Sequence, residues 1–82
     1  MTLQLIQEVA LTRDVPEYRL RTGDIATVVD FVKHPSGGED CCVLEVFNAV
    51  GESIEVVAVP MSAVEALRAD EILSVRPLAR AS

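Results

Sequence analysis

The sequence predicts an all-β protein, a small antiparallel barrel or roll of about five strands with one short helix or helical turn before the last strand. Three observations support this fold class. Short runs of β-branched residues recur along the chain, and three of the connections between them are rich in turn-forming residues. Successive runs also lie close enough in sequence to pair as antiparallel hairpins. With 82 residues, the chain has the length of a single domain, 1–82.

The first strand is expected over residues 6–12, because Val9 and Leu11 share one side of an extended chain. A long loop or irregular hairpin follows over residues 12–24, where Pro16 and closely spaced charges interrupt any regular period. The second strand is expected over residues 24–33. The stretch LRTGDIATVVDF leads into it, with Gly23 permitting a tight turn and Asp24 closing that turn.

The third and fourth strands are expected over residues 41–47 and 54–59, separated by a turn around Asn48 and Gly51. A turn over residues 34–40, with one proline and two glycines, precedes the third strand. Strands two to four each carry apolar residues on both faces, so a second, partner-covered surface is expected. The candidates for that interface are Val43, Phe47, Val57 and Val59, together with Tyr18 on the long loop.

The C-terminal part of the chain is expected to hold the short helix and the last strand. Pro60 ends the fourth strand, and Ser62 with Glu65 has the spacing of a capping box, which predicts a helix over residues 63–68. The last strand is expected over residues 71–76, stopped by Pro77. Residues 1–5 and 78–82 are expected to be loosely ordered tails.

Composition narrows the classes of partner. Half of the residues are hydrophobic and the mean hydropathy is +0.33, which is high for a chain with so much surface to cover. We therefore expect a homo-oligomer or another protein partner. The net charge of −6 argues against nucleic acid and anionic lipid as partners. The N-terminus lacks the basic residues of a signal peptide, and no apolar run reaches the length of a membrane span, so we expect a cytoplasmic protein.

No motif in the sequence predicts catalysis, a cofactor or a small-molecule substrate. The single glycine of LRTGDIATVVDF leads into a strand, whereas a phosphate-binding loop needs several glycines and a following helix. His34, Cys41 and Cys42 do not have zinc-site spacing, and the adjacent cysteines should face opposite sides of a strand, so neither a metal site nor a disulfide framework is indicated. We expect a protein that is not an enzyme.

Two alternative functions remain open. Arg13, Arg19 and Arg21 surround Tyr18 on the long loop, and basic residues around an aromatic ring can form a nucleic-acid platform. Acidic residues interleave with these arginines, which favours solvated ion pairs instead. The other alternative is an accessory protein that neutralises a toxin or regulates an enzyme by binding it, a role that the acidic charge permits.

The stretch VALTRDVPEYRLRTGDIATVVDF resembles the opening of a family of small bacterial proteins, domain of unknown function 4926. The segments EVFNAVGES, VAVPMSAVEAL and DEILSVRPL are similar to later parts of that family, so the resemblance extends over residues 6–78. Ala26 departs from the family's usual glycine. The matching positions in the opening stretch are Asp14, Pro16, Glu17, Leu20, Gly23, Thr27, Val28 and Val29.

The resemblance implies an SH3-like β-barrel in which residues 12–24 form the long first loop. It implies no reaction. It also implies an accessory role, because members of the family are often encoded on mobile or horizontally acquired DNA.

Overall fold

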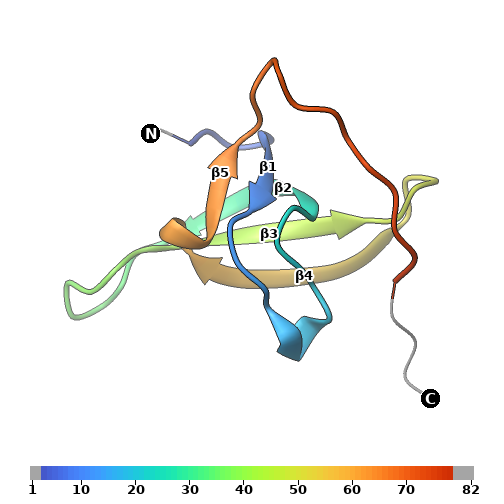
Figure 1. The fold of residues 1–82 in the computed structure, drawn as a ribbon. Helices are drawn as coiled ribbons and strands as arrows, with labels where there is room; N and C mark the ends of the chain where they lie inside the picture. The colour runs from blue at the N-terminus through green and yellow to red at the C-terminus, as the bar shows by residue number, and fades with distance from the viewer. Residues whose placement is uncertain (1–2, 79–82) are drawn as a thin grey trace.

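The computed structural model describes residues 3–78 and contains five antiparallel strands in one sheet (Figure 1). Their order across the sheet is β4-β3-β2-β1-β5. Within the described residues, helical structure is confined to two short 3₁₀ turns, so the predicted all-β class is confirmed. The elements are β1 Glu8–Leu11, η1 Pro16–Tyr18, β2 Ile25–Val32, β3 Cys41–Phe47, β4 Ser53–Pro60, η2 Met61–Ala63 and β5 Val64–Ala66.

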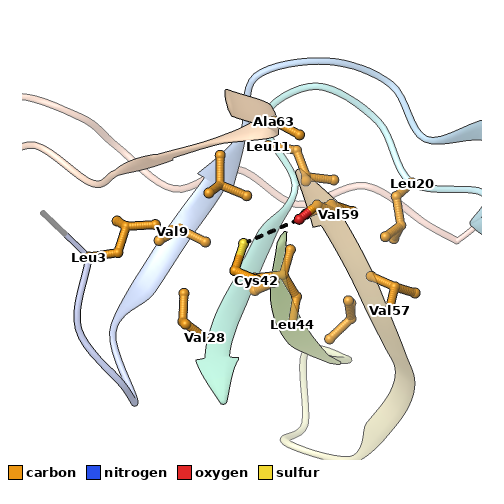
Figure 2. Close-up of a cluster of buried hydrophobic side chains, with 13 residues drawn as sticks. Leu3, Val9, Leu11, Leu20, Val28, Cys42, Leu44, Val57, Val59 and Ala63 are labelled. Atoms are coloured by element: carbon orange, nitrogen blue, oxygen red, sulfur yellow. Dashed lines mark hydrogen bonds between the residues drawn. The ribbon is translucent and has the colours of Figure 1, made fainter. Parts of the chain in front are cut away.

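The core lies on one side of the sheet, where apolar side chains of all five strands converge (Figure 2). Alternation along each strand selects its members, since every second residue of β3 and of the C-terminal half of β4 is buried. Leu44 and Cys42 are fully buried and lie opposite Val57 and Val59 in the β3–β4 ladder. The Cys42 thiol donates a hydrogen bond of 3.7 Å to the Val59 carbonyl, drawn as the dashed line in Figure 2.

A β-bulge in β2 changes which residues of that strand face the core. The register of the β2–β3 pair shifts between Val28 and Asp30. Val28 is fully buried, whereas two residues later Asp30 is exposed and lies opposite Val43. The extra residue therefore explains why neither face of β2 reads as cleanly polar in the sequence.

The sheet is not closed into a barrel. Strands β4 and β5 form its two edges, and the connection between them runs through η2. The topology still fits the barrel class that the resemblance implies, because a long loop joins β1 to β2 and a 3₁₀ turn joins β4 to β5. Closing the sheet into a barrel would require hydrogen bonds between β4 and β5, and this sheet order does not include them.

The helix predicted over residues 63–68 is wrong, because this segment contains the end of η2 and strand β5. The capping box does not form there. The Ser62 amide and hydroxyl both donate to the Glu39 carboxylate, at 2.8 and 3.1 Å, so a glutamate from another loop binds the serine. The Thr12 amide also donates to the Ala63 carbonyl at 2.8 Å, which brings the following residues alongside β1.

The last strand predicted over residues 71–76 is also wrong, because the strand that pairs with β1 is Val64–Ala66 and residues 71–76 pair with no strand of the sheet. The segment instead leaves the sheet after β5 and passes outside it, drawn in red in Figure 1. At the other end, Leu3 is buried in the core at 8% exposure, so the expected loose tail over residues 1–5 is corrected there. The rest of that expectation at residues 1–2, and at 79–82, lies outside the described residues.

Candidate functional site

The side of the sheet opposite the core carries exposed apolar side chains on β3 and β4, and we call it the outer face. Val43 and Phe47 of β3 belong to it, as do Ile54, Val56 and Ala58 of β4. Phe47, Ile54 and Val56 are 42%, 40% and 55% exposed. The charged residue between them is Glu45, which lies opposite Val56. Large apolar side chains that gather beside a sheet edge are typical of an interaction surface.

Two of the predicted interface residues belong to the core instead. Val57 and Val59 are each 2% exposed and contact the buried cluster (Figure 2), so their predicted placement on a partner-covered surface is wrong. The physical reason is register: Leu44 and Cys42 face the core, and their cross-strand partners must face the same side. Val43 and Phe47 do lie on the outer face. Tyr18 is 39% exposed, on η1 of the long loop.

Sequence reasoning missed Ile54 and Val56, although both belong to the outer face. One signal in the sequence bears on them. The short turn around Asn48 and Gly51 restricts how β3 and β4 can align, and alternation from a chosen partner pair then assigns every side chain of β4 to a face. A bulge between Val46 and Phe47 shifts that alignment, and nothing in the sequence marks it.

The stretch LRTGD is the corner through which the long loop enters β2. Gly23 adopts a φ of 91°, a conformation that favours glycine, and its amide donates to the Leu11 carbonyl at 2.8 Å. The Asp24 carboxylate accepts from the Arg21 amide at 2.8 Å. Asp14 stabilises the same corner by accepting from the amide and hydroxyl of Thr22, and these hydrogen bonds lower the pKa of Asp14.

Asp24 also binds Arg76, which lies 52 residues further along the chain. The guanidinium donates to both carboxylate oxygens, with Nε 2.8 Å from Oδ1, and Nη2 also donates to the Arg19 carbonyl at 3.1 Å. The side chains of Arg76 and Asp24 are 27% and 19% exposed, respectively. Burial acts to raise the pKa of Asp24, but the hydrogen bonds from Arg76 and from the Arg21 amide outweigh it, so the pKa is lowered.

A groove of about 510 Å³ lies between the outer part of the sheet and residues 73–78. Its apolar lining comes from both sides: Ile25, Phe47 and Ile54 from the sheet, and Leu73, Val75 and Leu78 from the C-terminal segment. Asp24 and Arg76 also line the groove, and they bind each other there. The chemistry of the groove is thus that of an apolar contact surface with one internal ion pair.

The three arginines proposed for nucleic acid are held in two different places. The Arg13 guanidinium donates to the Ser62 hydroxyl at 3.3 Å, beside η2. Arg21 and Arg19 flank the corner before β2, where the Arg21 amide binds Asp24 and the Arg19 carbonyl accepts from Arg76. Asp14 and Asp24 accompany these arginines in the folded loop.

His34 organises the turn between β2 and β3. Its Nδ1 accepts hydrogen bonds from the amides of Ser36 and Gly38, both at 3.1 Å. Cys41 is half-buried and Cys42 is buried, and both are free thiols. Among residues 3–78 there is no group of three or more His, Cys, Asp or Glu side chains placed to hold a metal ion. In the same part of the chain, no helix is long and apolar enough to span a membrane.

The chain matches the sequence model of a known family. The sequence model of a family described as Domain of unknown function (DUF4926) matches residues 5–72, which confirms the resemblance found in the sequence. No curated protein and no solved structure matches the chain at a significant level. The matched region includes the corner at Asp24 and the whole five-stranded sheet, and it ends before Arg76.

Proposed function

The chain belongs to the DUF4926 family, and we propose that it is a non-catalytic binding module that acts by protein–protein contact, through association with a second copy of itself. The observation that supports this proposal is the outer face. Phe47, Ile54 and Val56 remain 40–55% exposed on a chain in which half of all residues are hydrophobic. Covering such side chains would remove apolar surface from water and stabilise a complex.

The position and charge of the outer face favour a second copy over a basic partner. Strand β4 is an edge strand that pairs only with β3, so its outer side is accessible to another molecule. On β3 and β4 the outer face carries one carboxylate, Glu45, and Asp30 of β2 lies opposite Val43, so apolar side chains make up most of this strip. An apolar strip beside an open edge can bury itself against the same strip in an isologous dimer.

The proposal also places the protein in the cytoplasm, because both cysteines are free thiols and a reducing compartment keeps them so.

The test is the native mass of the purified chain across a concentration series, measured by size-exclusion chromatography with light scattering. The wild-type chain is expected to form a dimer, and Val56→Asp is expected to give a monomer with an unchanged circular dichroism spectrum. Leu5→Asp is the matched control, since Leu5 is also 55% exposed but lies before β1. It should leave the dimer intact.

Two results would contradict the proposal. A wild-type chain that stays monomeric at all concentrations would remove self-association. Equal loss of the dimer in Val56→Asp and Leu5→Asp would show that added charge, and not the outer face, controls the assembly. Phe47→Asp provides a second outer-face variant from the neighbouring strand, and it should behave as Val56→Asp does.

A further inference from the structure

We propose that residues 72–78 form a strap that competes with the partner for the outer face, and that the ion pair between Arg76 and Asp24 is the latch that keeps this strap in place. The inference rests on the proposed function, because the surface that the strap restricts is the one through which the chain would associate.

The latch is built more firmly than an ordinary surface ion pair. Arg76 contacts both oxygens of Asp24 and the carbonyl of Arg19, so three hydrogen bonds fix the planar guanidinium. Asp24 is also held by the Arg21 amide, which orients the carboxylate whether or not the arginine is bound. The receiving site is therefore a preformed part of the corner before β2, and Arg76 is the side chain that docks into it.

The rest of the strap has little other attachment. It begins after a turn in which the Glu71 amide donates to the Arg68 carbonyl at 3.1 Å. Ile72 and Val75 are 94% and 89% exposed, and Leu73 is 62% exposed, although all three are apolar. The strap lies outside the five-stranded sheet. Its position against the protein consequently depends on the latch far more than on packing.

The strap borders the surface proposed for association. Leu73, Val75 and Leu78 line one side of the groove, and Phe47 and Ile54 of the outer face line the other. A partner that covers Phe47 and Ile54 from this side must displace the strap or fit around it. The family model includes Asp24 but ends at residue 72, so Arg76 lies beyond the region that it matches.

The experiment compares the full-length wild type with Arg76→Gln and with the control Arg68→Gln. Both variants lose one positive charge, but Arg68 pairs with Asp70 in an exposed contact outside the latch, with side chains 69% and 75% exposed. The first readout is the set of backbone order parameters of residues 72–78 from 15N NMR relaxation, which reports how firmly the strap is held without reference to assembly. The second is the dimer dissociation constant from a concentration series with light scattering.

Arg76→Gln is expected to lower the order parameters of the strap and to lower the dimer dissociation constant about fivefold, the effect of losing one partly exposed ion pair. Arg68→Gln should change neither readout. Arg76→Lys should fall between wild type and Arg76→Gln, because an ammonium group cannot contact both carboxylate oxygens as a planar fork does.

Each contrary result has a separate meaning. Unchanged order parameters in Arg76→Gln would overturn the latch. Lower order parameters with an unchanged dissociation constant would overturn the competition and leave the proposed function standing. If wild type and Arg76→Gln both remain monomeric while the order parameters of the strap fall, the proposed function fails together with the competition, and the latch alone is retained.

Discussion

Strand β4 and the segment over residues 71–76 have similar sequences but different structures. Both are extended and rich in Val, Ile or Leu, yet β4 pairs along its length with β3 while the C-terminal segment stays outside the sheet. A short turn presents β3 to β4 at once, whereas the C-terminal segment follows β5, which already occupies the edge of β1. The difference shows that β-propensity alone does not make a strand, because residues 71–76 join neither edge of the sheet, β4 or β5.

An aspartate placed in each segment should give the largest difference in stability between the two regions. Val57→Asp puts a charge into the core at a side chain that is 2% exposed, and we expect a loss of about 4 kcal/mol or more in the free energy of unfolding. Val75→Asp, at a side chain that is 89% exposed, should change it by less than about 0.5 kcal/mol. Urea denaturation followed by circular dichroism measures both. Comparable losses would show that the C-terminal segment is packed as β4 is.

Truncating an apolar side chain should give a smaller difference in the free energy of unfolding between the two regions. Leu44 lies opposite Val57 and is fully buried, so Leu44→Ala is expected to cost about 3 kcal/mol of stability. Leu73→Ala, at a side chain that is 62% exposed, should stay within about 0.5 kcal/mol of wild type. The same denaturation experiment is used. A cost above about 1.5 kcal/mol for Leu73→Ala would mean that the strap contributes to the core.

Acid should affect the attachment of the strap before it affects the core. Because the pKa of Asp24 is lowered in the folded chain, its ionised form favours the latch above the ordinary carboxyl pKa of 3.8. That stabilisation is lost as the pH falls through the lowered value. Besides Arg76, the charged groups acting on Asp24 include Arg21, and Asp14 lies at the same corner.

An NMR titration of the Asp24 carboxyl carbon should thus give a pKa below 3.8 in wild type and a higher pKa in Arg76→Gln, where burial is opposed by fewer hydrogen bonds. Arg68→Gln serves again as the control and should titrate as wild type does. Identical titrations in wild type and Arg76→Gln would show that the two side chains are not paired in solution.

Much of the fold follows from local pattern. The runs predicted at residues 24–33, 41–47 and 54–59 correspond to β2, β3 and β4, because each combines β-branched residues with glycine- or proline-containing turns. The helix at 63–68 could not be excluded from sequence, since the serine that should cap it binds Glu39 from a distant loop. Local pattern cannot show that contact.

The candidate site was less accessible to sequence reasoning. The sequence predicts all four valine and phenylalanine candidates on β3 and β4 to be at the surface, and Val43 and Phe47 do lie on the outer face. Val57 and Val59 lie in the core, because a shift of one residue in register exchanges the two faces of a strand. The latch joins Asp24 and Arg76 across 52 residues, and no motif or spacing in the sequence predicts such a pair.

The adjacent cysteines of β3 give the chain a chemical reporter of its own motion. Cys41 is half-buried, whereas the Cys42 thiol is buried, bound to the Val59 carbonyl and raised in pKa by that burial. A thiol-alkylating reagent should modify Cys41 directly, and it should reach Cys42 only when β4 separates from β3. The ratio of the two labelling rates would therefore report how often the β3–β4 hairpin opens in the native protein, without any introduced probe.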